Sequence, residues 1–288
     1  MRLTLKLQDV EERNKYFNII SFSGGKDSTA LLLRLLEEGV RLDGILYCDT
    51  GVEYPENYRH IDKVEKYIGQ PITRLGGSYE ESFEYLMTKK PKTGGRSKFP
   101  EELGYGWPGN RNRWCTNVMK AQRVDAWKKE KVEKLGIDPA NIRHYIGIAA
   151  NETRRCQEGF EYPLVTWGMT EDDCLQYCID RGFDWEGFYN TFARLSCWAC
   201  PLQRIGEFRL VREHYPEFWQ KMLDMDKNLD MRFRNRNFLT QYNRVQDLED
   251  RFAREDAEKI ENERRAKLGL PPVKPSRKTV KKTPKKES

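Results

Sequence analysis

The sequence predicts an α/β protein built on a doubly wound, mainly parallel sheet, with a helical extension towards the C-terminal end of the chain. Two observations carry this prediction. Short apolar runs alternate with helical patterns between residue 16 and about residue 148, and polar, glycine-containing motifs follow directly after the first two apolar runs. Alternation at this spacing is typical of parallel strands joined by helices. Ligands of such sheets bind beyond the carboxyl ends of the strands.

The elements follow one another in a regular order. We expect strands over residues 16–21, 43–48, 71–75 and 141–148, after a charged entry strand or arm over residues 1–15. We expect helices over residues 28–38, 57–68, 78–87 and 112–135, then one capped by Thr170, and two more over residues 207–228 and 237–264. Residues 89–112 are rich in Lys, Gly, Pro and Arg, which suits a lid over a polyanion. The expected parts are a catalytic domain over residues 1–220, a helical arm over 221–270 and a disordered basic tail over 271–288.

Composition limits the classes of function. The 288 residues carry a net charge of +6, and residues 273–288 hold seven Lys or Arg against one Glu, so this tail carries the whole surplus. Such a tail suits contact with nucleic acid or acidic partners, or simply a solvated end. We find no apolar run long enough for a membrane span and no signal peptide. The seven cysteines then suit a reducing cytoplasm, where metal binding or thiol chemistry is commoner than disulfides.

Residues 21–29, which read SFSGGKDST, are the candidate anion site. A strand, a glycine turn and a helix in that order place free backbone N–H groups and partial positive charge at a helix N-terminus, where phosphate binds well. Gly24 and Gly25 permit a close approach of the backbone, and Lys26 adds a cation. Asp27 either caps the helix or helps to hold Mg²⁺ beside the phosphates. The letters do not fit a Walker A loop, because Asp27 follows the lysine.

Several segments together resemble a known family. SGGKDS is similar to the pyrophosphate-binding loop of the adenine nucleotide alpha-hydrolase-like superfamily, and DTGVEYPE at residues 49–56 resembles a segment of the phosphoadenylylsulfate (PAPS) reductases. RWCT at residues 113–116 is similar to the phosphorothioation-type sulfur-transfer members, and residues 146–155 resemble a segment bordering the nucleotide, with Ala149 where an Arg is usual. The resemblance implies that ATP (with Mg²⁺) or PAPS binds to Ser23, Gly24, Gly25, Lys26, Asp27, Ser28, Thr29, Asp49, Thr50, Gly147 and Glu152.

The cysteines suggest a second centre. Cys197 and Cys200 form a Cys-x-x-Cys turn, which can chelate one metal or cluster but needs further ligands. The resemblance brings Cys115 to this pair as the third ligand and implies a 4Fe–4S cluster, with zinc or a thiol redox pair as alternatives. Cys156, or else Cys48, is a candidate fourth ligand. Cys174 and Cys178, four apart on one helix, are interpreted as buried structural residues.

The expected function is an enzyme of sulfur metabolism, either an ATP-dependent sulfurtransferase or a PAPS reductase-like oxidoreductase. Its expected catalytic residues are Lys26, Asp27, Cys115, Lys120 and Arg194. The Cys-containing C-terminal motif of thioredoxin-dependent PAPS reductases is missing after Cys200, which argues against simple sulfate reduction. A sulfur donor protein, such as a cysteine desulfurase or a thioredoxin-like protein, is an expected partner. The competing hypothesis is a non-catalytic nucleotide sensor or nucleic-acid-binding component of a larger system.

Overall fold

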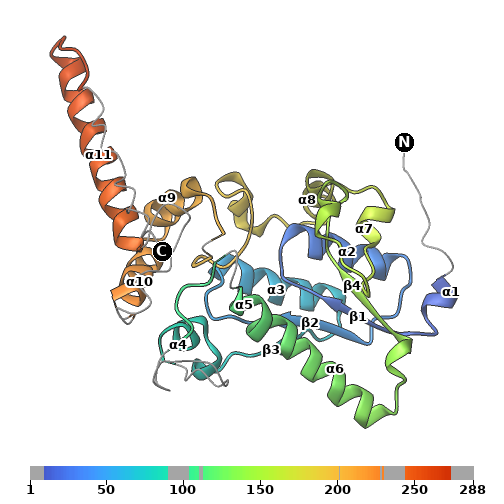
Figure 1. The fold of residues 1–288 in the computed structure, drawn as a ribbon. Coiled ribbons are helices and arrows are strands. Elements are labelled where there is room, and N and C mark those ends of the chain that lie inside the picture. Colours follow the sequence, from blue (N-terminus) through green and yellow to red (C-terminus); the bar gives the residue numbers. More distant parts are fainter. Residues whose placement is uncertain are drawn as a thin grey trace, which may run out of the picture.

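The computed structural model contains a four-stranded parallel sheet (Figure 1). It describes residues 10–89, 104–109, 113–200, 202–227, 229 and 244–273. The strand order is β3-β2-β1-β4, and each neighbouring pair is parallel. The strands are β1 (Phe17–Ser21), β2 (Gly44–Cys48), β3 (Thr73–Leu75) and β4 (Ile142–Ile146). The predicted α/β fold class with a parallel sheet is confirmed.

Helices connect the strands and cover both faces of the sheet. In chain order they are α1 (Val10–Arg13), α2 (Lys26–Glu37), α3 (Pro55–Ile68), α4 (Phe83–Thr88), α5 (Trp114–Thr116), α6 (Gln122–Leu135), α7 (Pro163–Thr166) and α8 (Glu171–Ile179). Shorter turns are η1 (Tyr79–Glu81), the π-helical η2 (Asn117–Ala121), η3 (Pro139–Asn141), η4 (Ala150–Arg155) and η5 (Trp185–Asn190).

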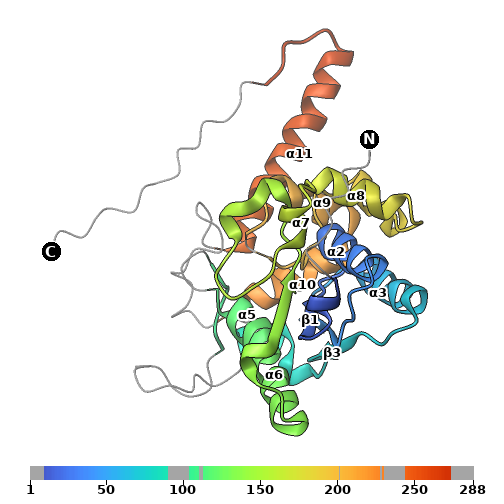
Figure 2. The same ribbon diagram turned by 90° about the vertical axis from the view of Figure 1, so that its right-hand side faces the viewer.

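Successive side chains of β1 point to opposite faces of the sheet, and helices cover both of these faces. Ile20 faces the large core that includes residues of α2 and α3, whereas Ile19 belongs to a smaller cluster with Leu46 and Val124 of α6. Gly44 allows α6 to lie close, because a Cβ there would meet the Trp127 ring at 2.5 Å. Figures 1 and 2 show α6 on the opposite side of the sheet from α2 and α3.

Several helix ends follow local sequence signals. Pro55 opens α3, and Gly69 ends it in the left-handed conformation. Thr170 caps α8 in a capping box with Asp173, as the sequence predicts. The expected helix over residues 78–87 is instead η1 followed by α4, because the Ser82 hydroxyl accepts from the Tyr85 N–H at 3.2 Å and starts a new helix.

The C-terminal part of the described chain is helical, as the sequence predicts. It comprises α9 (Ile205–His214), α10 (Pro216–Lys227) and α11 (Val245–Lys267). The single helix expected over residues 207–228 is wrong, because Pro216 lacks an N–H and separates α9 from α10. Arg212 of α9 binds Glu249 and Asp256 of α11.

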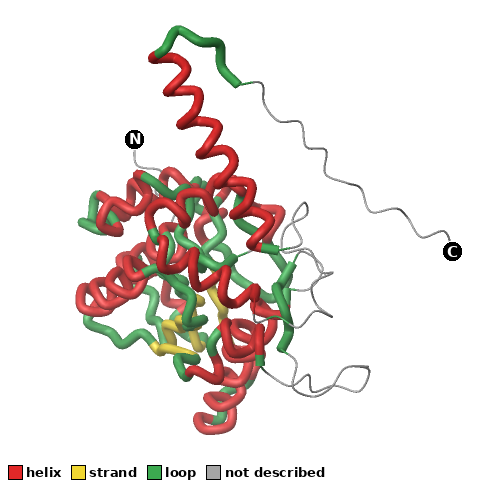
Figure 3. Tube along the Cα trace, turned by 90° about the vertical axis from the view of Figure 1, so that its left-hand side faces the viewer, coloured by secondary structure: helices red, strands yellow, loops and turns green. Residues whose placement is uncertain are grey.

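The helix α11 projects from the rest of the molecule (Figures 1 and 3). The division of the chain after residue 220 stays a prediction. Most of the expected lid and most of the basic tail lie outside the described residues. Among the residues that the structure describes, every helix is too short or too polar to cross a bilayer.

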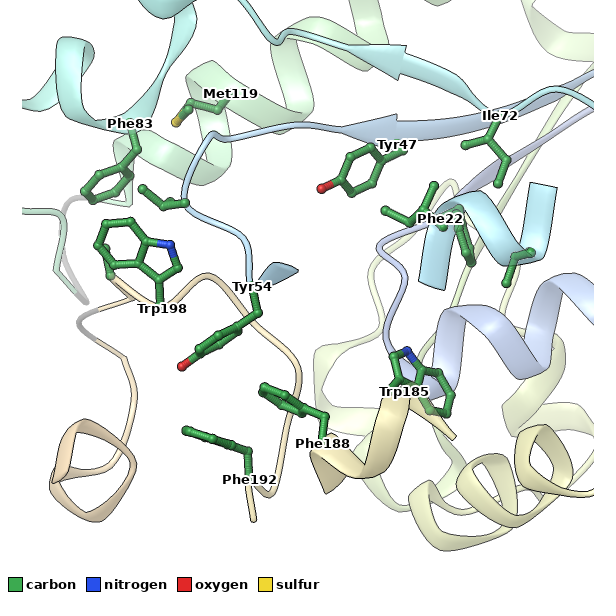
Figure 4. Packing of buried hydrophobic residues seen from close by; sticks show 14 of the residues in the cluster. Phe22, Tyr47, Tyr54, Ile72, Phe83, Met119, Trp185, Phe188, Phe192 and Trp198 are labelled. Carbon is green, nitrogen blue, oxygen red and sulfur yellow. The ribbon is translucent and has the colours of Figure 1, made fainter. Parts of the chain in front are cut away.

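An aromatic cluster links the sheet to the cysteine segment. The Tyr54 ring, which precedes α3, packs against Phe188 and Phe192 at centroid distances of 4.9 and 5.5 Å. Trp198 is buried between the two cysteines of the Cys-x-x-Cys turn, and its backbone N–H donates to the Val52 carbonyl at 2.9 Å. Figure 4 shows these rings around the segment that follows β2. The turn is therefore fixed to the edge of the sheet where the strands end.

Candidate functional site

The glycine turn lies between β1 and α2, at the carboxyl end of β1. Gly24 adopts a φ of 80°, which an L side chain rarely adopts, and a Cβ there would lie 2.0 Å from Asn57 Oδ1. Gly25 caps α2 without any side-chain hydrogen bond to the helix end. The Lys26 N–H donates to the Tyr189 hydroxyl at 3.0 Å, so an anion at the first turn of α2 would bind to the N–H groups that follow it or compete with this hydroxyl.

Two of the polar side chains in this loop have internal partners. The Ser28 hydroxyl donates to the Gly25 carbonyl at 3.0 Å and accepts from the Ser23 N–H at 3.2 Å. Thr29 is fully buried, and its hydroxyl pairs with His60 Nε2 at 2.9 Å. Thr29 therefore supports the loop from inside the protein, while Ser23 lies at the surface of the turn.

The loop lysine points to α8. Lys26 is only 7% exposed, and its ammonium lies 3.0 Å from a Glu171 carboxylate oxygen and 5.5 Å from the centre of the Tyr189 ring. The hydrogen bond from Lys26 lowers the pKa of Glu171. The ammonium that a bound phosphate would contact is therefore already paired with the Glu171 carboxylate.

Three carboxylates gather beside the loop. Asp27, Glu152 and Glu171 each offer a ligand atom, and these atoms all lie within 4.8 Å of one another. Asp27 Oδ1 is buried without a hydrogen-bond partner, and burial raises the pKa of this carboxyl to about 6, with Glu171 and Glu152 adding to the rise. Clustered carboxylate oxygens suit Mg²⁺, which binds through one or two carboxylates together with substrate phosphates. The residues present therefore fit the metal that ATP brings.

Gly147 explains how Glu152 reaches this group. A Cβ on Gly147 would lie 2.8 Å from the Ser28 nitrogen and 2.9 Å from its Cα, so only glycine allows the end of β4 to lie against the first turn of α2. The turn η4 follows and carries Glu152, which pairs with Arg155. Arg154 and Arg155, the alternative replacements for the arginine missing at Ala149, both lie in η4, and Arg155 is the one that pairs with Glu152.

The motif after β2 is held by its own hydrogen bonds. Asp49 Oδ1 accepts from the Gly51 N–H at 2.9 Å and from the Tyr58 hydroxyl at 2.8 Å. Thr50 is buried, and its hydroxyl donates to Glu53 at 2.8 Å. Both side chains therefore shape the turn at the carboxyl end of β2, at the same sheet edge as the glycine loop.

The cysteine pair forms a tight turn. The Cys200 N–H donates to the Cys197 carbonyl at 3.1 Å, and the Gln203 amide binds the Cys197 and Trp198 carbonyls at 2.9 and 3.0 Å. The two thiols hydrogen-bond to each other, which lowers the pKa of Cys200 and raises that of Cys197. Arg194 and Lys120 also lower the pKa of Cys200. Of the two thiols, Cys200 therefore has the lower pKa.

Cys115 and Lys120 come to this pair from a distant part of the chain. Burial raises the pKa of Cys115, and the charge of Cys200 adds to the rise. Loss of hydration lowers the pKa of Lys120, but negative charge at Cys197, Glu53, Cys48 and Cys115 outweighs this and raises it. Cys48 lies against the Lys120 carbonyl at 3.8 Å, whereas Cys156 ends η4. Lys120 therefore interacts electrostatically with the thiols of Cys48, Cys115 and Cys197.

Four residues of this region escaped the sequence reasoning. Glu171 belongs to no motif in the sequence, although Lys26 and Asp27 lie beside it. Asn57 donates to the Ser23 carbonyl at 3.2 Å, and Trp185 donates to that of Gly24 at 2.7 Å. Tyr189 accepts from the Lys26 N–H at 3.0 Å. No spacing in the sequence indicates these contacts, because most of them join residues more than 100 positions apart.

Comparison with known families supports the resemblance. Residues 18–131 match the family model of the phosphoadenosine phosphosulfate reductase domain. The match covers less than half of the chain. The matched region includes the glycine loop, the motif after β2, Cys115 and Lys120, whereas the carboxylates from η4 and α8 and the Cys-x-x-Cys turn lie beyond it.

Relatives extend the similarity beyond the matched domain. The chain is 25% identical over 231 residues to an uncharacterized protein of Methanocaldococcus jannaschii, which covers 75% of this chain and 42% of the relative. A second uncharacterized protein of that organism is 27% identical over 223 residues, 75% of this chain and 49% of the relative. An uncharacterized nin region protein of Escherichia phage lambda is 24% identical over 205 residues, 66% of this chain and 68% of the relative. The chain therefore spans less than half the length of the first two relatives.

Proposed function

We propose that this protein binds ATP with Mg²⁺ at the glycine loop and uses the neighbouring thiols to transfer sulfur to an acceptor that ATP has activated. The observation that carries the proposal is the group of Asp27, Glu152 and Glu171 beside the N-terminus of α2. The match of residues 18–131 to the family model supports an adenine-nucleotide ligand in general.

The carboxylates favour ATP over PAPS. Three acidic groups beside a phosphate site repel a bare polyanion, and Lys26 is already paired with Glu171. Mg²⁺ removes this repulsion, because it binds carboxylate and phosphate oxygens together. A nucleotide that arrives with Mg²⁺ is therefore the ligand that this charge arrangement accommodates best.

The loop supports departure of pyrophosphate. An acceptor oxygen attacks the α-phosphorus of ATP, and the bond to the bridging oxygen breaks, so that pyrophosphate leaves with the bonding electrons. Backbone N–H groups at the start of α2 and the Lys26 ammonium stabilise the charge that develops on this leaving group. Hydrosulfide then attacks the adenylated carbon, and AMP leaves.

The thiols are the candidate ligands of a cluster that would serve the second step. Cys115, Cys197 and Cys200 are the residues that would hold a 4Fe–4S cluster, and Cys48 lies beside the same Lys120 as a fourth thiol. A cluster held by three thiolates would supply an iron at which a sulfide could bind. Lys120 and Arg194 place positive charge beside these sulfurs and so attract an anionic sulfur species. A cysteine desulfurase delivers its sulfur as a persulfide, so this chemistry requires that donor together with a thiol reductant, which supplies two electrons and releases the sulfur as hydrosulfide.

The experiment combines metal analysis with nucleotide binding. Anaerobically purified protein should be brown and contain about four irons per chain. It should bind ATP more tightly with Mg²⁺ than without, and more tightly than PAPS. Lys26→Ala should lose this affinity, whereas Lys129→Ala, a change at a 78% exposed side chain, should keep it. One zinc per chain would overturn the proposed cluster. Tighter binding of PAPS than of ATP, without Mg²⁺, would overturn the assignment of ATP and favour a PAPS reductase-like activity.

The nucleotide-sensor hypothesis is tested with the same protein. A chain that binds ATP but forms no pyrophosphate or AMP with any acceptor and hydrosulfide acts as a sensor. Deleting residues 273–288 separates the roles further. Loss of nucleic-acid binding with retained pyrophosphate release marks a catalytic body with a tethering tail.

A further inference from the structure

Two carbonyl groups of the glycine turn are held by buried side chains. The Asn57 side-chain amide donates to the Ser23 carbonyl at 3.2 Å, and the Trp185 indole donates to the Gly24 carbonyl at 2.7 Å. Asn57 belongs to α3 and is 1% exposed, and Trp185 belongs to η5 and is 2% exposed. Both carbonyls therefore point into the protein, where they do not repel an anion that binds to the turn.

The bond from Trp185 fixes the direction of one backbone donor. The Gly24 carbonyl shares its peptide unit with the Gly25 N–H, and in a trans peptide, the form found at this bond, the two groups point in opposite directions. The Gly25 N–H is therefore turned away from Trp185. Within the part of the chain that the structure describes, it makes a single hydrogen bond, a long one of 3.5 Å to the Ser23 hydroxyl on the exposed side of the turn.

The next donor along the chain is less accessible to an anion. The Lys26 N–H is bound to the Tyr189 hydroxyl at 3.0 Å, so a phosphate oxygen at this donor would displace the hydroxyl. A phosphate oxygen at the Gly25 N–H would replace only the long bond to Ser23. A backbone donor just ahead of a helix also benefits from the partial positive charge of the helix end. The Gly25 N–H is therefore the donor of this turn that a phosphate reaches most easily.

Trp185 keeps its position in spite of an unfavourable backbone conformation. Trp185 and Glu186 have φ values of 50° and 55°, in the left-handed region that non-glycine residues rarely adopt. The Trp185 ring stacks on the His60 ring at 4.3 Å between centroids, and His60 Nε2 pairs with the Thr29 hydroxyl of α2 at 2.9 Å. Figure 4 shows the Trp185 ring beside the start of α2. Contacts with the turn and with α2 therefore offset the strain, as is typical of strained residues at functional sites.

Asn57 fixes the peptide that precedes the one bound by Trp185. A Cβ on Gly24 would lie 2.0 Å from Asn57 Oδ1 and 3.2 Å from a side-chain carbon of Ile61, so the backbone of Gly24 lies directly against α3. Rotation of the Ser23–Gly24 peptide would break the bond from Asn57 to the Ser23 carbonyl. The two side chains together therefore hold the turn in one conformation.

We propose that Trp185 is a positioning residue for the nucleotide: by holding the Gly24 carbonyl it turns the Gly25 N–H towards a phosphate group, and Asn57 supports it from the preceding peptide. The assignment deepens the proposed function, since it rests on a polyphosphate binding at this turn. It also states which part of the ligand the two side chains act on. The Gly25 N–H serves the phosphate chain and not the adenosine.

The first test is calorimetry with three ligands. Trp185→Phe keeps an aromatic ring and removes the indole N–H. It should weaken the binding of ATP and of inorganic pyrophosphate, each with Mg²⁺, by the same factor of roughly ten, the effect of losing one well-placed hydrogen bond to a charged group. The affinity for adenosine should not change. Unchanged affinity for ATP, or an equal loss for adenosine, would overturn the proposal.

Trp219→Phe is the matched control. Trp219 is another buried tryptophan, in α10, and its indole donates to the Glu249 carboxylate at 2.6 Å. The control removes the same N–H and the same volume of side chain, so it should lower the melting temperature comparably and leave the binding of all three ligands unchanged. A tenfold loss of ATP affinity in this variant too would show general loosening of the protein and overturn the role of Trp185.

The second test needs no ligand. In the crystal structure of ligand-free Trp185→Phe we expect the Gly24–Gly25 peptide to be rotated relative to the wild type, and an unchanged peptide would overturn the proposal. If Trp185→Phe does not fold, Asn57→Ala takes its place in both tests, with the same selective loss of ATP and pyrophosphate expected. Wild-type protein that binds neither ATP nor pyrophosphate would overturn the proposed function, and this outcome is distinct, because the ligand-free structure decides what Trp185 does to the turn.

Discussion

Replacing Gly147 by alanine tests whether the nucleotide loop depends on contact between β4 and α2. The added Cβ would lie 2.8 Å from the Ser28 nitrogen and 2.9 Å from its Cα, and 3.0 Å from the Asp27 carbonyl carbon. These are backbone atoms, which cannot rotate away as a side chain can. Contacts below 3.0 Å force a shift of the end of β4, and overpacking of this kind costs about 1–3 kcal/mol of stability.

The assay pairs urea unfolding with ATP binding. We expect Gly147→Ala to lower the free energy of unfolding by about 1–3 kcal/mol and to weaken ATP binding by roughly tenfold, since 1.4 kcal/mol corresponds to a factor of ten. Gly206→Ala is the matched control, because a Cβ there meets nothing within 4 Å and Gly206 lies in α9. That change should raise stability by up to about 1 kcal/mol. The reasoning is refuted if Gly147→Ala matches the wild type in both measurements.

Three further predictions follow from single contacts. Burial lowers the pKa of His144 from 6.5 to about 4, so its contribution to stability is complete above pH 6.5 and is lost as the pH falls towards 4. His144→Gln should therefore reduce the loss of unfolding free energy between pH 6.5 and about pH 4 by up to about 3 kcal/mol. An unchanged dependence of the unfolding free energy on pH would contradict this. Arg123 donates to the backbone carbonyls of Asp49, Leu75 and Glu81. Arg123→Ala should therefore lower the free energy of unfolding by about 2 kcal/mol, measured by urea unfolding. An unchanged free energy of unfolding would show that water replaces the guanidinium. Glu171→Gln frees Lys26, so calorimetry should show stronger ATP binding without Mg²⁺ and a smaller gain on adding Mg²⁺; an undiminished gain would remove Glu171 from the metal site.

Local sequence signals were enough to predict the sheet and the glycine loop. Apolar runs with glycine turns between them lie close together in the chain, so β1, the loop and α2 follow from neighbouring residues. The break between α9 and α10 was missed although Pro216 signals it, because the helical pattern of apolar residues continues on both sides. The predicted helix boundary is therefore wrong where a single proline interrupts a longer helical pattern of apolar residues.

The geometry of the site depends on contacts that sequence spacing does not show. Lys26 meets Glu171 and Tyr189 across 145 and 163 positions, and the carboxylate group joins residues of α2, η4 and α8. The Cys197–Cys200 pair is a local motif, whereas the approach of Cys115 was expected only from the family resemblance. The position of Cys48 is explained by the topology of the sheet, since β2 ends at Cys48, beside the Lys120 backbone carbonyl.

The most direct test of the account is the crystal structure of the anaerobically purified protein with ATP and Mg²⁺. We predict that the phosphates lie on the N-terminus of α2 beside Lys26, with Mg²⁺ bound by at least one of Asp27, Glu152 and Glu171, and that the α-phosphate faces the thiols of Cys115 and Cys200. Nucleotide bound elsewhere, or phosphates turned away from these sulfurs, would contradict the central claim.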